Sequence, residues 1–550
     1  MSRLFSIQFK HQLTLAQALT ALAIGLLFNT PILANTSSSV NNSISPLISS
    51  SINNSTESTG SAEQLPELGD SAAGLMPPAQ EQALGQAWLR SFRASVPLES
   101  DPLVFEYLEN LLFKLSSFSN IKDKDLDLVV VSNPNINAFA VPGGVIGVNT
   151  GLLLYAESEA QLASVLSHEL AHLSQRHFAR SVEASQRASF TTLAGVLAGI
   201  VLAAASEGDA ASAAIMASQA AALDARLRYS RMHEKEADRL GMKTLVDAGY
   251  PAESAALMFK QMLNASRLYG NKVPEFLLTH PVTESRIADA SNRARQQAAT
   301  RTAPIINTPS LDYLLVKARI AVLTRLPNQA SDKEAAKDNI KRFKLDLKKL
   351  ATPEPSSPSN KNAPTELALS PASSAARYGL AMSYLQNQQW RKARKTLAPL
   401  IQQAPYKLAY SLLDIDIDIE AGNSQLAEQR LQELNATMPN NYAISMALAK
   451  TMLANTKYKD AQQVLQTLTK TRPTQADVWY LMAETHGLAG DILQLHQARA
   501  EFFLLRGNFS QARQHLKHAL YFSQENYQTV ARIKERIRDV NSLQKITENL

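Results

Sequence analysis

The 550-residue sequence contains no cysteine, and this absence removes several kinds of chemistry. Disulfide bonds, thiolate zinc sites and thiol nucleophiles are all excluded, because each of them needs a cysteine sulfur. Any metal ion must therefore be held by histidine and carboxylate side chains. Export from the cytoplasm stays compatible with the sequence, since disulfides are permitted in oxidising compartments but are not required there.

Long apolar runs are also scarce. The run at residues 13–28 is short for a membrane span, and polar residues interrupt it. Arg3 precedes this run and Ala34 follows it at a suitable cleavage point, so we interpret residues 1–34 as a signal peptide cleaved near Ala34. An uncleaved membrane anchor is the alternative.

A basic stripe interleaved with aromatic residues is missing, although the formal net charge is +6. Nucleic acid is therefore not an expected partner. Two Ala-rich stretches, residues 190–205 and 210–222, are too short to cross a bilayer. We expect them to form a helical hairpin that is buried or makes peripheral contact with a membrane.

The informative stretch is His168-Glu169-Leu170-Ala171-His172, an H-E-x-x-H motif within a predicted helix from Ser158 to about Arg180. On a helix the two histidines lie one turn apart on the same face, so both can bind one metal ion. Glu169 lies beside them and can take a proton from the water that zinc activates. A chance match on an exposed helix is the competing interpretation.

A second predicted helix, residues 226–248, carries the acidic residues Glu234, Glu236 and Asp238 close together. A carboxylate from a separate helix is the usual third ligand of an H-E-x-x-H site. Glu234 and Asp238 are four residues apart and share a face, so we predict that Glu234 binds the metal and Asp238 steadies a ligand imidazole. Glu236 points elsewhere and is expected to lie in solvent.

His280 stands at the start of a further predicted helix. It is a surface residue, a removable fourth ligand, or a donor to the tetrahedral oxyanion. The predicted site therefore holds one Zn²⁺ per chain through His168, His172 and Glu234, with Glu169, Asp238 and His280 as the candidate catalytic residues.

Three short strands are predicted at residues 126–132 and 137–149, the last two joined by a Pro-Gly-Gly turn. Such strands beside a metal helix can offer an edge to which an extended peptide adds. A plain structural hairpin is the alternative.

The carboxyl-terminal part is repetitive, with a small residue and a proline each recurring every 34 residues: Ala393, Ala427 and Ala461, and Pro405, Pro439 and Pro473. This period is typical of tetratricopeptide repeats, which are pairs of helices. Ala500 and Ala512 belong to a further unit displaced by about half a period, which suggests a shared or capping helix.

The predicted fold class is mainly α: an α+β zincin-type metalloprotease domain with a small β-sheet, followed by an α-solenoid of tetratricopeptide repeats. The expected regions are a signal peptide (1–34), a disordered Ser/Asn-rich leader (35–75), the protease domain (76–300), a helix with a Pro/Ser-rich linker (301–373), and the repeats (374–550).

These motifs resemble those of a family of bacterial envelope gluzincin metalloproteases. The similar segments are Asn137 to Ala140, Gln161 to Glu169, Gln175 to His177, Glu234 to Asp238, Thr279 to Pro281, and Arg286 with Ile287. The resemblance implies that His168, His172 and Glu234 are zinc ligands and that Glu169 is the general base. It also implies that His280 can cap the zinc and hold the enzyme latent.

The resemblance further implies a periplasmic enzyme, at the inner face of the outer membrane, that serves outer-membrane protein assembly and quality control. Its partners would be the outer-membrane β-barrel assembly machinery and unfolded or stalled outer-membrane proteins. It would promote maturation of the lipopolysaccharide-transport barrel and degrade misassembled barrels. The main rival hypothesis is a repeat-based chaperone or scaffold with a latent metal site, and a third is an integral membrane peptidase anchored by residues 13–28.

Overall fold

The computed structural model describes residues 76–184, 231–268, 275–300, 310–324, 331–351, 369–523 and 526–548. The predicted signal peptide, leader, Ala-rich stretches and most of the Pro/Ser-rich linker lie outside the described residues, and the boundaries of the five regions stay predictions. None of the described helices combines the length and the apolar character that a bilayer crossing requires.

The first region begins with α2 (Pro78–Ser95) and α3 (Pro102–Ser117), which precede a three-stranded sheet. The start of α3 is fixed by Asp101, whose side chain accepts hydrogen bonds from the Leu103 and Val104 amides. The strands are β1 (Asp127–Val131), β2 (Ala138–Val141) and β3 (Val145–Asn149), in the order β1-β3-β2. Strand β3 runs parallel to β1 and antiparallel to β2, so β2 is an edge strand.

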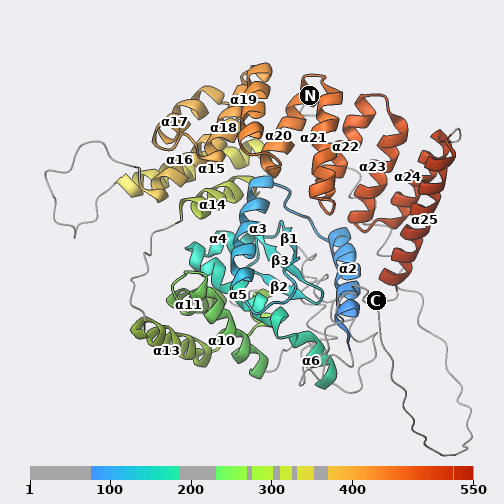
Figure 1. The fold of residues 1–550 in the computed structure, drawn as a ribbon. Helices are drawn as coiled ribbons and strands as arrows, with labels where there is room; N and C mark the ends of the chain where they lie inside the picture. Colours follow the sequence, from blue (N-terminus) through green and yellow to red (C-terminus); the bar gives the residue numbers. More distant parts are fainter. Residues whose placement is uncertain are drawn as a thin grey trace, which may run out of the picture. The chain divides into compact units, whose positions relative to one another are not determined.

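The sheet leads into α4 (Thr150–Tyr155), α5 (Glu159–Ser174) and α6 (His177–Ala184), and the same region continues with α10 (Arg231–Asp247), α11 (Glu253–Leu268), α12 (Glu275–Thr279) and α13 (Glu284–Thr300). Helix α5 is buried along almost its whole length. It packs against α10, α11 and β2, and Figure 1 shows it beside the sheet.

The single helix predicted from Ser158 to about Arg180 is wrong in one respect. Helix α5 ends at Ser174 and α6 begins at His177, because Arg176 adopts a left-handed backbone conformation with φ of 49°. A residue in that conformation cannot continue a right-handed helix, so the chain changes direction there.

The remaining described elements are helices: α14 (Leu311–Leu323), α15 (Asp332–Ala351), α16 (Pro371–Gln386), α17 (Trp390–Gln403), α18 (Leu408–Glu420), α19 (Ser424–Thr437), α20 (Tyr442–Ala454), α21 (Tyr458–Thr471), α22 (Ala476–Leu488), α23 (Ile492–Leu505), α24 (Phe509–Phe522) and α25 (Tyr527–Glu548). The starts of α17, α19, α21 and α23 are each 34 residues apart. This spacing continues to α23, so the helix starts do not show the displacement by about half a period that was predicted for the last unit. The predicted fold class, a mainly α chain with a small sheet and helical repeats, is confirmed.

Candidate metal centre

The site depends on a close approach between helices α5 and α10. Gly241 of α10 lies against the α5 backbone, and a Cβ atom at this position would come within 3.0 Å of the His168 Cα. A glycine therefore allows the two helices to pack at this distance. The approach places the acidic face of α10 opposite the histidine face of α5.

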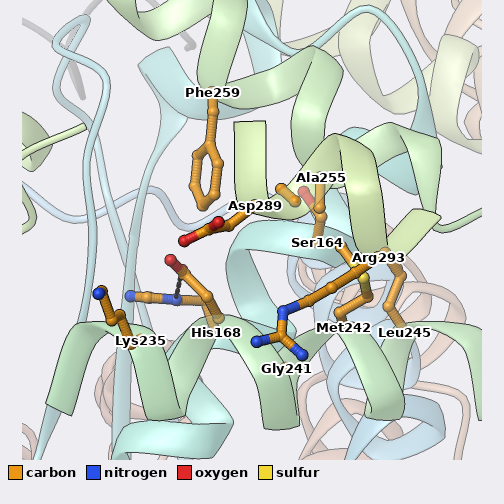
Figure 2. A pocket seen from close by; sticks show the side chains of 12 residues that line it. Ser164, His168, Lys235, Gly241, Met242, Leu245, Ala255, Phe259, Asp289 and Arg293 are labelled. Atoms are coloured by element: carbon orange, nitrogen blue, oxygen red, sulfur yellow. Dashed lines mark ion pairs between the residues drawn. The ribbon is translucent and has the colours of Figure 1, made fainter. Parts of the chain in front are cut away.

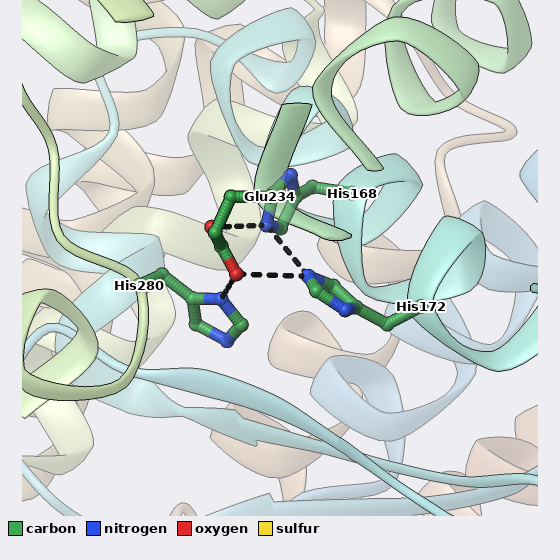
Figure 3. A group of neighbouring side chains, drawn as sticks. All are labelled: His168, His172, Glu234 and His280. Carbon is green, nitrogen blue, oxygen red and sulfur yellow. Dashed lines mark hydrogen bonds and ion pairs between the residues drawn. The ribbon is translucent and has the colours of Figure 1, made fainter. Parts of the chain in front are cut away.

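Four of the predicted residues meet at one point, as Figure 3 shows: His168, His172, Glu234 and His280. The two Nε2 atoms of His168 and His172 are 3.0 Å apart. The Glu234 carboxylate lies 3.5 Å from the first of these atoms and 3.4 Å from the second. His280 donates to Glu234 through Nδ1 at 3.0 Å, and all four side chains are buried.

This donor set fits zinc. One ligand atom from each of the four residues can be chosen so that all lie within 4.8 Å of one another. A tetrahedral zinc ion with bonds of about 2.0–2.2 Å would hold its ligand atoms roughly 3.3 Å apart, close to the separations observed here. The Arg286 guanidinium contacts Glu234 and Asp238, so it offsets part of the negative charge at the site.

Burial acts to lower the pKa of both histidines of the motif, but the charges beside the two rings differ. Burial opposes the charged form of His168, but its contacts with Asp238 and Glu234 raise the pKa of His168 to about 10. Burial and the neighbouring charge of His168 hold the pKa of His172 well below its ordinary value. In the metal-free protein, His168 is therefore the charged ring of the pair and His172 the neutral one.

His168 is supported from behind by Asp238, whose Oδ1 lies 3.1 Å from His168 Nδ1. Arg286 donates to both oxygens of Asp238, at 2.8 and 2.6 Å, and its Nη1 lies 2.9 Å from Glu234 Oε2. The same guanidinium donates to the Pro281 carbonyl at 2.8 Å. Asp238 therefore contacts the side of His168 that faces away from His172, and Arg286 joins the two acidic residues to the segment after His280.

His172 is supported by residues to which the sequence assigned no role. His177 Nδ1 lies 2.8 Å from His172 Nδ1, and His177 Nε2 lies 3.2 Å from Glu236 Oε2. Arg180 donates to the same Glu236 oxygen at 2.9 Å. The prediction that Glu236 lies in solvent is wrong, since its side chain is only 26% exposed and is bonded on two sides. The bend at Arg176, which local periodicity does not indicate, is the reason.

Glu169 lies beside the metal ligands with only 1% of its surface exposed. Its Oε1 has no hydrogen-bond partner among the described residues, and the nearest His280 nitrogen is 3.7 Å away. Burial raises the pKa of Glu169, although His280, His168 and the Ala140 amide act against that rise. Ala140 belongs to β2, so the edge strand directs an N–H group at the carboxylate.

A small cavity of about 50 Å³ lies behind His168, between α5, α10, α11 and α13. Figure 2 shows Lys235, Asp289 and Arg293 around it, with Phe259 on one side. It lies on the Asp238 side of His168, away from the facing Nε2 atoms of the two histidines. The cavity therefore belongs to the supporting layer of the site and is not a substrate pocket.

The chain matches known protein families in both regions. The pattern of Peptidase family M48 matches residues 102–294, and that of the tetratricopeptide repeat matches residues 418–485. A β-barrel assembly-enhancing protease of Escherichia coli (strain K12) is 31% identical over 82% of this chain and 86% of its own length. A relative of Vibrio cholerae, described as a putative β-barrel assembly-enhancing protease, is 34% identical with the same coverage. The mitochondrial metalloendopeptidase OMA1 of Arabidopsis thaliana is 32% identical over 30% of this chain and 31% of its own length.

Proposed function

The chain belongs to the M48 metallopeptidases, in the family of the β-barrel assembly-enhancing proteases, and is a zinc metalloprotease. From this membership we propose that His168, His172 and Glu234 are the zinc ligands and that Glu169 is the general base. The observation that carries the proposal is the meeting of the three proposed ligands, from two helices, and His280 at one buried point, with the buried Glu169 beside them.

Zinc, when bound, lowers the pKa of a water molecule and polarises the carbonyl of the scissile peptide bond. Glu169 then takes a proton from the attacking water and passes it to the leaving amine. Burial raises the pKa of this carboxyl group, which suits a group that must both accept and release a proton near neutral pH.

Strand β2 is proposed to hold the substrate. It is the edge strand of the sheet, and its Ala140 amide is directed at Glu169. An extended peptide that adds to this edge would place its backbone beside the base. Only an extended or unfolded segment can add in this way, so folded proteins would be poor substrates.

His280 is proposed to keep the resting enzyme latent. Its ring is 2% exposed, donates to Glu234 and faces Glu169. In this position it occupies space that a substrate and a water molecule would need. A shift of the segment that carries His280 would open the site, and the ring could then donate to the oxyanion.

The names of the relatives suggest the biological setting. We propose that this enzyme is periplasmic and acts in the assembly and quality control of outer-membrane β-barrel proteins. The repeats would hold the assembly machinery or a stalled barrel, in a chaperone-like role, and the protease would degrade barrels that fail to assemble, including a stalled lipopolysaccharide-transport barrel. Unfolded barrel strands are extended segments, as addition to the edge of β2 requires.

The test compares the wild type with Glu169→Gln and His280→Ala, using zinc content and cleavage of an unfolded outer-membrane protein. Glu169→Gln should keep the metal and lose cleavage by roughly 10²–10⁴-fold, whereas His280→Ala should cleave faster than the wild type. Retained cleavage by Glu169→Gln would rule out the proposed base.

A repeat-based chaperone with a permanently closed metal site is the second candidate, and the buried position of His280 favours it, because a fourth protein ligand is typical of structural zinc sites. In that case His280→Ala would gain no proteolysis, while the wild type would still suppress aggregation of the unfolded protein.

A further inference from the structure

A second histidine stands behind the proposed zinc ligand His172. His177 is fully buried, and its Nδ1 lies 2.8 Å from His172 Nδ1. Its other nitrogen lies 3.2 Å from Glu236, which also accepts from Arg180 at 2.9 Å. These four side chains form one hydrogen-bonded row that runs outward from the metal site.

The backbone is built to bring His177 to this place. On a continuous helix, a residue five positions after His172 would point roughly 140° away from it. The left-handed conformation at Arg176 instead turns the chain back. The Arg176 side chain donates to the Met76 carbonyl at 2.6 Å and to Glu81 at 3.1 Å, so contacts with the start of α2 hold the turn.

The distances determine where the protons lie. Two imidazole nitrogens 2.8 Å apart share one proton, so one ring donates and the other accepts. A zinc ligand that binds through Nε2 carries its proton on Nδ1, so His172 must be the donor and His177 Nδ1 the acceptor. The proton of His177 is then on Nε2, where it faces the Glu236 carboxylate.

The opposite arrangement is unfavourable at both ends of the row. If His177 donated to His172, His172 would carry its proton on the nitrogen that faces the metal. His177 would then present a lone pair to a carboxylate, which is repulsive. Glu236, held ionised by its ion pair with Arg180, therefore favours the tautomer in which His172 can bind metal.

We propose that His177 and Glu236 are positioning residues for zinc binding, in which Glu236 selects the tautomer of His172 through the intervening His177. This inference rests on the proposed zinc-ligand role of His172. Zinc-bound histidines usually donate directly to a carboxylate or carbonyl, as the contact of Asp238 with His168 allows. For His172 the acceptor is instead the neutral imidazole of His177, and the carboxylate of Glu236 accepts from His177 in turn.

The experiment measures zinc affinity of the full chain, by competition between the metal-depleted protein and a chromophoric chelator. His177→Phe keeps the volume and removes the acceptor, and it should weaken zinc binding by roughly 10–100-fold. His177→Asn places a carbonyl oxygen near the former Nδ1, so it should recover part of that loss. The visible spectrum of the cobalt-substituted protein should shift for His177→Phe, because the ligand field of His172 changes.

His177 is buried, so His177→Phe can fail to fold. Glu236 is partly exposed, so Glu236→Gln is expected to fold and tests the same inference. A glutamine can present an N–H to His177 Nε2 and favour the wrong tautomer, so zinc affinity should fall by roughly 10-fold. The double variant with His177→Phe should bind zinc no more weakly than His177→Phe alone, since Glu236 acts through His177.

His233→Phe is the matched control. His233 stacks on His177 with ring centres 4.4 Å apart. A phenylalanine keeps a ring at this place and leaves the contacts between His172, His177 and Glu236 intact, so this variant should keep the wild-type zinc affinity. Wild-type affinity in folded His177→Phe or in Glu236→Gln, or additive losses in the double variant, would overturn the inference. A wild-type protein that binds no zinc would instead overturn the proposed function.

Discussion

Buried acidic side chains occur in both the metal-site region and the repeats, but their surroundings differ. In the repeats, Asp418 is 1% exposed and forms ion pairs with Arg394 of α17 and Arg430 of α19. Glu428 is 2% exposed and accepts from Lys457 at 2.6 Å and from Asn455 at 2.7 Å. Each of these carboxylates pairs with cationic side chains beside it, and these ion pairs connect its helix to neighbouring repeat segments.

At the metal centre, by contrast, three carboxylates gather around two facing imidazoles, and the Arg286 guanidinium contacts two of these carboxylates. Burial of charge is therefore not itself a sign of function in this chain. What distinguishes the metal centre is that its acidic groups converge on two imidazoles, an arrangement that a divalent cation would complete.

The largest expected effect tests this contrast with two isosteric substitutions. Glu234→Gln removes a proposed ligand and should lower zinc affinity by more than roughly 10³-fold, since zinc binds charged and imidazole ligands far more tightly than amides. Glu428→Gln makes the same chemical change in a buried acid of the repeats and should leave zinc affinity unchanged. Equal zinc affinities in the two variants would break the comparison.

Asp238→Asn sharpens the contrast within the metal centre. It removes the charge that supports His168 while leaving an acceptor oxygen, so zinc affinity should fall by roughly 10-fold. Chelator competition measures the change, and the thermal stability of the metal-free protein serves as the control. If Asp238→Asn lowers only the thermal stability and the folded fraction binds zinc as tightly as the wild type, then Asp238 serves only as a structural partner of Arg286.

Asp418→Asn should affect stability and not chemistry. The substitution removes one of the two carboxylates that contact both Arg394 and Arg430, the other being Asp414. The free energy of unfolding should therefore fall by roughly 1–3 kcal/mol. Urea unfolding followed through Trp479 measures the loss, and zinc content and cleavage at a temperature below unfolding should match the wild type. A variant that loses zinc would contradict the separation of the two regions.

The smallest effect concerns acid sensitivity of the last repeats. Burial, with the neighbouring His496 and Arg499, lowers the pKa of His515 to about 4, whereas an unfolded histidine titrates near 6.5. Between these values the unfolded chain binds a proton that the folded chain does not, so stability is full above about pH 6.5 and falls as the pH drops toward 4.

His515→Gln should therefore recover about 1 kcal/mol of the stability that the wild type loses between pH 7 and pH 5. Paired unfolding curves at the two pH values provide the measurement. The same acid-induced loss in both proteins would show that other groups are responsible.

Much of the fold and part of the site could be predicted because their signals are local. The 34-residue period comes from helices of similar length and spacing, and the H-E-x-x-H motif needs only the geometry of a single helix to bring two imidazoles together. The four-residue spacing of Glu234 and Asp238 likewise follows from the geometry of a single helix, which places both side chains on one face. The order of residues along one helix is sufficient to predict these features.

The rest was decided by contacts between segments far apart in the sequence. The sequence by itself determined a histidine pair, a nearby base, an acidic helix and a repeat array. Only the tertiary structure decided that Gly241 lets α10 approach α5, that His280 reaches Glu234, and that the bend at Arg176 carries His177 to a partner, Glu236, that had been expected in solvent. The physical reason is that helical periodicity determines on which face of its own helix a side chain lies. Which residues that face contacts depends on where the helix ends and on how helices pack, and no local pattern encodes either.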